Sequence, residues 1–227
     1  MTEASLLEQR IGYCFRDPNL LEQALTHSSR LQDFPEATDN QRLEFLGDSI
    51  LGVFLAEALF QTYPDEREGF LARAKSVLAK GNFLAQLARE LDLPPHLRLS
   101  EAERSQEGHT RDAALEDALE ALIGAIYLDS DYPTTRACLQ QWFGDLPPRL
   151  KKRLAQDNPK GRLQEWIQAQ GQEQPAYTIV NETGPGHARE FTAEVAIQGV
   201  VHGSGSGASK KEAEEAAARS AIAELDI

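Results

Sequence analysis

Two acidic residues, Glu44 and Asp48, lie one helical turn apart in a mostly apolar segment at residues 40–52. The apolar residues of this segment recur at helix spacing, so in a helix the two carboxylates share one face, roughly 6 Å apart along the axis. Few positions of the segment look suited to water, which predicts a buried helix. Carboxylates on a buried helix must be paired, hydrogen-bonded or bound to a cation. The alternative is that both acids are solvated, or that one pairs with Arg42.

A second acidic pair, Asp117 and Glu120, stands three residues apart in an apolar segment at residues 113–128. Each segment also carries a glycine a turn further on, Gly47 or Gly124, where the missing side chain lets another helix approach closely. Two such helices packed together place four carboxylates around one point. Four like charges in an apolar setting repel one another unless a divalent cation lies among them. Hard oxygen ligands suit magnesium or manganese better than zinc or copper.

The rest of the chain predicts two domains of different class. Helical patterns continue to about residue 143 without a strand signal, which predicts an all-α domain at residues 1–148. Two adjacent prolines and a basic, polar run predict a flexible linker at residues 149–158. A helix, three strands and a closing helix then predict a small α+β domain, in the order α-β-β-β-α, at residues 159–227.

The same patterns predict where the individual helices and strands begin and end. Helices are predicted at residues 5–11, 19–26, 40–63, 70–78, 82–91, 111–129 and 134–143, with a polar loop at 100–110. Strands are predicted at 177–180, 190–197 and 200–203, and Ser209 is expected to cap the closing helix. His27, alone ahead of the first acidic helix, is predicted to be a hydrogen-bonded structural residue and not a ligand.

The charge of the chain argues against a nucleic-acid partner if it is taken alone. The 227 residues carry a formal net charge of −13 at pH 7, so no global positive field attracts phosphates. Local groups of basic residues must therefore supply any contact with RNA. The clearest candidate is the pair Lys210 and Lys211 at the start of the last predicted helix, where free N–H groups and the helix dipole also attract phosphate.

The composition is that of an ordinary globular protein, with 41% hydrophobic residues and a mean hydropathy of −0.45. No apolar run of about 18 residues occurs, so no membrane span is expected. The acid-bearing N-terminus is not expected to be a signal peptide. Cys14 and Cys138 lack metal-like spacing and are expected to be buried free thiols, which fits a cytoplasmic protein.

Several motifs together resemble one known family, bacterial ribonuclease III. The decapeptide at residues 40–49, Asn-Gln-Arg-Leu-Glu-Phe-Leu-Gly-Asp-Ser, is similar to the signature of that family at all but one position. Residues 24–29, 68–69, 80–82 and 117–124 resemble further family segments, in the family's order. The C-terminal domain resembles the double-stranded RNA-binding domain that the family carries.

The resemblance implies an endoribonuclease that hydrolyses double-stranded RNA with Mg²⁺, for which Mn²⁺ can substitute, and leaves 5′-phosphate and 3′-hydroxyl ends with short 3′ overhangs. It implies RNA processing such as the maturation of ribosomal RNA precursors. The ion would be held by Glu44, Asp48, Asp117 and Glu120, of which Asp48 and Glu120 are the strongest candidates for direct catalytic ligands, and a second ion could arrive with the RNA. Glu68 matches a further acid of the family. Gln41 departs from the pattern, because the family usually has glutamate there.

The resemblance also assigns binding residues. Contacts with RNA map to Gln164, Glu165, Gln168, His187, Lys210 and Lys211. Such domains recognise the shape and the 2′-hydroxyls of A-form RNA. One site cuts one strand, and the family is a symmetric homodimer in which Phe45 matches the aromatic residue that enters the partner. The alternative for Phe45 is an ordinary core residue.

Other functions are less well supported by these residues. A non-catalytic double-stranded RNA-binding scaffold would have no need of intact acids, and an all-α metal phosphohydrolase acting on nucleotides would have no use for the C-terminal domain. Residues 203–208 fit a dinucleotide fingerprint, but the chain after them is too short for a second parallel strand. No nucleotide cofactor is therefore expected.

Overall fold

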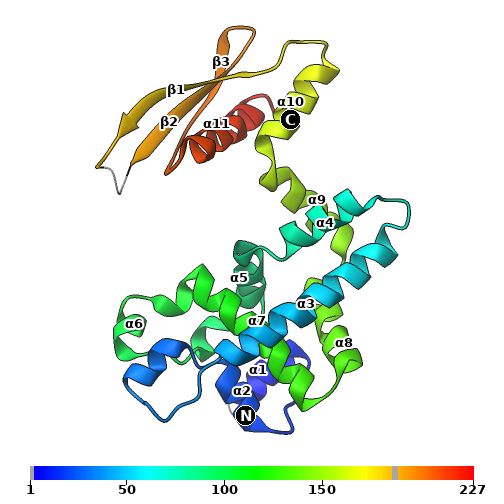
Figure 1. Ribbon diagram of the computed structural model, residues 1–227, viewed down its shortest axis with the longest axis vertical. Helices are drawn as coiled ribbons and strands as arrows, with labels where there is room; N and C mark the ends of the chain where they lie inside the picture. Colours follow the sequence, from blue (N-terminus) through cyan, green and yellow to red (C-terminus); the bar gives the residue numbers. More distant parts are fainter. Residues whose placement is uncertain (1–2, 186–188) are drawn as a thin grey trace. The chain divides into compact units, whose positions relative to one another are not determined.

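The computed structural model describes residues 3–185 and 189–227. The chain divides into two compact units, one up to Leu150 and one from Lys151 onward. The helices of the first unit are α1 (Glu3–Ile11), α2 (Pro18–Ala24), α3 (Gln41–Thr62), α4 (Glu68–Leu78), α5 (Gly81–Glu90), α6 (Glu101–Ser105), α7 (Asp112–Asp129) and α8 (Tyr132–Phe143), with short 3₁₀ turns η1 (Ser28–Gln32), η2 (Pro94–His96) and η3 (Gly108–Thr110) (Figure 1). The one β-bridge among the described residues of this unit joins Thr26 to Arg98. The prediction of an all-α first domain is therefore confirmed.

Helix α7 forms the centre of the first unit. The apolar side chains between Leu115 and Ile126 have no exposed surface, and the acids Glu116, Asp117 and Glu120 occupy the remaining positions with Gly124. Helices α2, α3 and α5 all pack against it, and the tilted rings of Phe54, Phe83 and Phe143 fill the core between neighbouring helices. Apolar side chains on a helix are buried by the helices that pack against them. Helices α2, α3 and α5 cover those of α7 in this way.

Helix α3 is buried on one side only, which corrects the expectation that it has almost no solvent-facing side. Leu43, Ile50 and Phe54 are buried. The side chains of Phe45 and Phe60 are 79% and 71% exposed. The physical reason is that periodicity shows which residues are apolar but not which of them a neighbouring helix covers.

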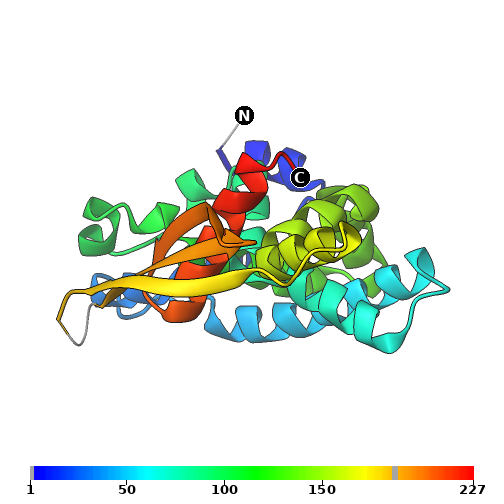
Figure 2. The same ribbon diagram turned by 90° about the horizontal axis from the view of Figure 1, so that it is seen from above.

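The second unit contains an antiparallel sheet of three strands with helices α10 (Pro159–Ala169) and α11 (Lys210–Glu224). The strands β1 (Ala176–Thr183), β2 (Glu190–Ile197) and β3 (Val200–Gly207) are hydrogen-bonded in sequence order. Figure 2 shows α11 lying along one face of the sheet. The predicted order α-β-β-β-α is confirmed, and Ser209 caps α11 by accepting a hydrogen bond from the Glu212 amide.

Strand β3 is longer than predicted, since it runs to Gly207 and not to Gly203. Gly203, Gly205 and Gly207 alternate along it and face the alanine-rich α11. A Cβ on Gly205 would lie 2.5 Å from the Ala216 side chain, so the glycines allow the strand and the helix to approach closely. The glycine pattern of residues 203–208 therefore has a packing role.

Three local predictions need correction. Residues 149–158, expected as a flexible linker, lie largely within helix α9 (Leu146–Asp157), because the prolines fall in its first turn, where proline is tolerated. The expected loop at 100–110 contains α6 and η3, and Ser100 caps α6 through the amide of Glu103. Cys138 is buried as expected, but Cys14 is exposed.

Of the helices in the described residues, none combines the length and the apolar character that a membrane span requires.

Candidate active site

Two glycines bring the acidic helices together. The carbonyl group of Glu120 on α7 occupies the space that a side chain at Gly47 on α3 would fill. In the reverse direction, the carbonyl group of Leu43 occupies the space beside Gly124. Backbone therefore lies directly on backbone where the helices cross, at the turns that carry the acids. This contact is the close helix approach that the two glycines predict.

Glu120 is the most deeply buried of the four predicted acids, with 9% of its surface exposed. Glu44 and Asp117 are half-buried and Asp48 is exposed. Among the described residues, no hydrogen bond or ion pair neutralises the Glu120 side chain. Burial of an unpaired carboxylate favours its protonated form and therefore raises its pKa.

The pKa of Glu120 is raised from 4.5 to about 8. Desolvation is the main cause, and the charges of Asp48, Glu116, Glu44 and Asp117 add to it in that order. The pKa of Glu44 is also raised, by desolvation first and then by the charge of Asp117. The charges of the four predicted acids therefore affect one another's environment, and their role as a set of metal ligands stays a prediction.

Glu116 is an acid of this neighbourhood that the sequence analysis missed. It stands one turn before Glu120 on α7, and its charge raises the pKa of both Glu120 and Glu44. Its own pKa is raised by desolvation, followed by the charges of Asp117, Asp112 and Asp48. The i, i+4 spacing from Glu120 was the available signal, but nothing local distinguished Glu116 from a solvated surface acid.

The donor set fits a hard divalent cation in its chemistry, because it consists of carboxylate oxygens around a buried and unneutralised acid. In residues 3–185 and 189–227, however, no group of three or more His, Cys, Asp or Glu side chains is arranged to hold an ion as it stands. The acids share a neighbourhood without forming a ligand cage. Exposed side chains such as Asp48 reorient easily, whereas the helix backbone that carries them is fixed by the glycine contact.

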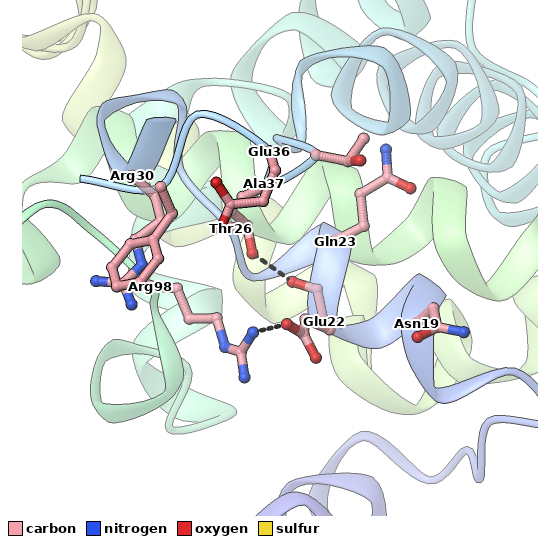
Figure 3. A pocket seen from close by; sticks show the side chains of 10 residues that line it. Asn19, Glu22, Gln23, Thr26, Arg30, Glu36, Ala37 and Arg98 are labelled. Carbon is pink, nitrogen blue, oxygen red and sulfur yellow. Dashed lines mark hydrogen bonds and ion pairs between the residues drawn. The ribbon is translucent and has the colours of Figure 1, made fainter. Parts of the chain in front are cut away.

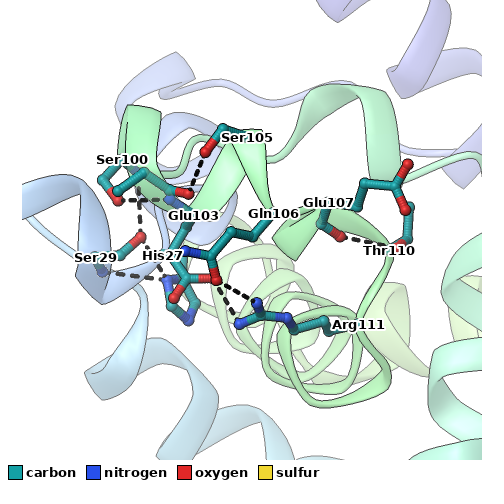
Figure 4. A network of polar contacts seen from close by, with 10 residues as sticks. His27, Ser29, Ser100, Glu103, Ser105, Gln106, Glu107, Thr110 and Arg111 are labelled. Carbon is teal, nitrogen blue, oxygen red and sulfur yellow. Dashed lines mark hydrogen bonds and ion pairs between the residues drawn. The ribbon is translucent and has the colours of Figure 1, made fainter.

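His27 lies near Asp117 and is connected through Ser29 to Ser100, the residue that caps α6. Its charge lowers the pKa of Asp117, against the larger and opposite effect of desolvation. The His27 Nδ1 atom accepts a hydrogen bond from the Ser29 amide at 3.1 Å and lies 2.9 Å from the Ser29 hydroxyl, which accepts from the Ser100 amide at 3.1 Å (Figure 4). His27 is thus hydrogen-bonded, as predicted.

The two units match two families of known proteins. Residues 17–145 match the family described as Ribonuclease-III-like, and residues 159–225 match the double-stranded RNA binding motif. Over 220 residues the chain is 41% identical to Ribonuclease 3 of Vibrio parahaemolyticus, with 96% of both chains covered. It is 42% identical over 226 residues to Ribonuclease 3 of Xylella fastidiosa, with 99% of this chain and 97% of that protein covered. The chain belongs to the ribonuclease III family.

A solved structure agrees with this assignment. The nuclease domain of ribonuclease III from Campylobacter jejuni is similar to 63% of this chain, with a TM-score of 0.59 and 36% sequence identity, and 97% of that domain is covered. As a member of the ribonuclease III family with a double-stranded RNA binding motif, the protein is an endoribonuclease that acts on double-stranded RNA.

Two other acid-site candidates of this ribonuclease III lie at the ends of helices. Gln41 is exposed at the first residue of α3. Its backbone N–H donates a hydrogen bond to the Asp39 carboxylate at 3.3 Å. Glu68 is exposed at the first residue of α4. Glu68 is not among the charges that dominate the pKa of Glu120. The role of Glu68 at the acid site stays a prediction.

The predicted RNA contacts of the ribonuclease III lie on two helices of the second unit. On α10, Glu165 and Gln168 are exposed, and Gln164 is half-buried beside the face that carries the buried Leu163 and Ile167. Lys210 and Lys211 open α11, and the Lys211 side chain is 84% exposed beside Glu215, at 3.9 Å. His187 lies outside the described residues. The RNA-binding roles of all these residues remain predictions.

A separate cavity of about 380 Å³ lies beside α2 and the segment that follows it (Figure 3). Arg98 points toward Glu22 and forms an ion pair with it, and the Arg30 guanidinium stacks on the Phe34 ring at 3.8 Å from the ring centre. None of the four predicted metal ligands lines this cavity. Its arginines already have partners within the chain, so it adds nothing to the chemistry of the acids.

Proposed function

We propose that this ribonuclease III hydrolyses the phosphodiester bonds of double-stranded RNA with Mg²⁺, which Mn²⁺ can replace, held by Glu44, Asp48, Asp117 and Glu120. The observation that carries the proposal is Glu120, a buried carboxylate without a neutralising partner in the described part of the chain, whose pKa is raised by its burial and further by the charges of four neighbouring acids. A divalent cation is the simplest group that neutralises such a site in the folded protein.

When bound, the cation supplies charge neutralisation for the scissile phosphate and lowers the pKa of a coordinated water. Glu120 and Asp48 hold the charge that attracts the ion, one from a buried and one from an exposed position. Gly47 and Gly124 keep their two helices in contact, which fixes the spacing of the acids. No nucleophilic side chain is required, and the membership in the ribonuclease III family implies products with 5′-phosphate and 3′-hydroxyl ends.

We further propose that two chains act together as a symmetric homodimer, so that both RNA strands are cut and short 3′ overhangs result. Support comes from an exposed apolar stripe on α3 and α7 formed by Phe45, Val53, Tyr127 and Leu128, of which Phe45 is the most exposed. Apolar surface of this kind marks interfaces. The similar nuclease domain from Campylobacter jejuni has a region involved in dimer formation.

The expected biological role is the processing of structured RNA, such as ribosomal RNA precursors, in the cytoplasm. Both cysteines are free thiols, which agrees with a reducing compartment. We place the domain limits at residues 1–148 and 159–227, a division supported by the two separate family matches at 17–145 and 159–225.

The proposal is tested by incubating the full chain with a long duplex RNA and Mg²⁺, followed by analysis of the fragment ends. We expect 5′-phosphorylated fragments, no cleavage after chelation with EDTA, and a loss of at least about 100-fold in Glu120→Gln, because metal-site charge stabilisation is worth several kcal/mol. RNA that is bound but left intact by the parent chain would instead support a non-catalytic scaffold. The Asp112→Asn variant, which removes an exposed acid from the same helix, serves as the control.

A further inference from the structure

Glu116 stands beside the proposed metal ligands and has no role in the proposed function so far. It is half-buried on α7, next to Asp117 and one turn before Glu120. Residues at i and i+4 project from the same face of a helix, so Glu116 and Glu120 point to the same side. That side faces α3 and α5, which both pack on α7.

The carboxylate of Glu116 lies against the first residue of α5. A Cβ built on Gly81 would overlap the Glu116 carboxylate, with its Oε1 atom at 2.8 Å and its Cδ atom at 2.6 Å. Only a residue without a side chain leaves this space to Glu116. The start of the ten-residue helix α5 also favours a negative charge, because the helix dipole is positive there.

The face of α7 that carries Glu116 also carries Glu120, one turn later, where α7 crosses α3. The backbone carbonyl of Glu120 fills the space beside Gly47, which lies between Glu44 and Asp48 on α3. The Glu120 side chain is 9% exposed and has no neutralising partner among the described residues. Glu116 therefore stands one turn from the crossing of the two acid-bearing helices.

We infer that Glu116 is a fifth oxygen donor of the divalent-cation site, and that Gly81 makes room for its carboxylate at the start of α5. The inference rests on the proposed function, because it adds a residue to the same site. The contribution of Glu116 is one more negative oxygen for a cation that prefers six or more oxygen ligands.

The inference is tested by Mn²⁺ binding to the full chain without RNA, followed by electron paramagnetic resonance at neutral pH. We expect Glu116→Gln to weaken the binding of Mn²⁺ by about 10-fold or more, as removal of a group that supports a metal site typically does. Asp112→Asn is the matched control, since it removes the same charge from the same helix one turn earlier, and we expect it to change the affinity by less than about twofold, as for an exposed charge. Glu120→Gln reports on the proposed function itself and should abolish binding.

The outcomes distinguish the role of Glu116 from the existence of the proposed metal site. If Glu116→Gln binds Mn²⁺ as well as Asp112→Asn does while Glu120→Gln fails to bind, the role of Glu116 is refuted and the proposed site stands. If Glu120→Gln also binds normally, both are refuted. Circular dichroism of each variant establishes that the fold is intact.

A second pair of variants tests the role of Gly81 without removing a charge. Gly81→Ala places a methyl group where the Glu116 carboxylate lies, so it should weaken Mn²⁺ binding in the parent chain. In a Glu116→Ala background the same change should have no further effect, because no carboxylate remains to be displaced. Equal effects of Gly81→Ala in both backgrounds would show that the two residues are not coupled and would overturn the assignment.

Discussion

Gly47 and Gly124 lie against each other where α3 crosses α7. A Cβ on Gly47 would lie 3.0 Å from the amide nitrogen of Gly124, and a Cβ on Gly124 would lie 3.2 Å from the amide nitrogen of Gly47. Each would also overlap a backbone carbonyl group of the opposite helix. A backbone atom cannot move aside as a flexible side chain can, so the contact fixes how closely the two acid-bearing helices approach.

We therefore predict that Gly47→Ala destabilises the protein by about 2 kcal/mol or more, in the upper range for overpacked cores, and that it lowers cleavage because the acids separate. Thermal unfolding and the cleavage rate measure the two effects. Gly69→Ala is the control: it lies in the first turn of α4 with open space around it, so alanine there should be neutral or slightly stabilising. Equal stability of the two variants would contradict the prediction.

The stability of the metal-free protein should decrease as the pH rises. The folded-state pKa of Glu120 is about 8, above its ordinary value of 4.5. Between these values the folded protein binds a proton that the unfolded chain has lost. The stabilisation of the folded state by the protonated Glu120 side chain is therefore fully present below about pH 4.5, and it is lost as the pH rises through 8. Thermal unfolding in EDTA across this range is the measurement, and Glu120→Gln should remove this part of the pH dependence.

Magnesium should oppose this loss of stability. Because the ion binds the deprotonated carboxylates, its stabilising effect should be larger at pH 8 than at pH 6. A rise in melting temperature with Mg²⁺ that is the same at both pH values would argue against Glu120 as a ligand. The Asp112→Asn variant should respond to Mg²⁺ as the parent chain does.

Gln41 is expected to leave the enzyme active, although the family usually has glutamate at this position. Its side chain is exposed at the start of α3, whereas Glu120 is buried. A charge added at an exposed position has a small effect, so Gln41→Glu should change the cleavage rate by less than about 10-fold. An inactive parent chain that is rescued by Gln41→Glu would refute this prediction.

Phe45→Ala should weaken the proposed dimer. The Phe45 side chain is 79% exposed in the single chain, and burial of a phenylalanine in an interface contributes about 1.5–3 kcal/mol per copy. Sedimentation at micromolar concentration should show a dimer for the parent chain and a mixture with monomer for Phe45→Ala. Phe34→Ala, an exposed aromatic stacked on Arg30, is the control and should sediment like the parent. A parent chain that sediments as a monomer would exclude the dimer.

Lys210 and Lys211 should contribute to RNA affinity through phosphate contacts. Their double replacement by alanine should weaken the binding of duplex RNA and reduce the slope of log affinity against log salt by about 1–2, one contact per lysine. Arg219→Ala removes an exposed basic residue from the same helix, more than two turns further along, and should leave the slope unchanged. Binding titrations at several salt concentrations distinguish the two variants.

Much of this protein can be predicted from local patterns. The spacing of Glu44 and Asp48, and of Asp117 and Glu120, placed each pair on a helix, and the structure contains those helices. The strand and turn patterns after residue 175 predicted the three-stranded sheet. Periodicity depends only on neighbours in the sequence, so a single sequence is sufficient for predictions of this kind.

The tertiary structure decided which of these residues are covered and which come together. Phe45 is as apolar as the buried Phe54, yet its side chain is 79% exposed because no described helix of the first unit packs over it. In the sequence alone, Glu116 cannot be distinguished from a surface acid. Only the packing of α5 on α7 shows that Gly81 lies against its carboxylate. The raised pKa of Glu120 likewise depends on charges from α3. Burial and Coulomb interactions depend on distances between segments far apart in the sequence, and only the packing of the helices determines those distances.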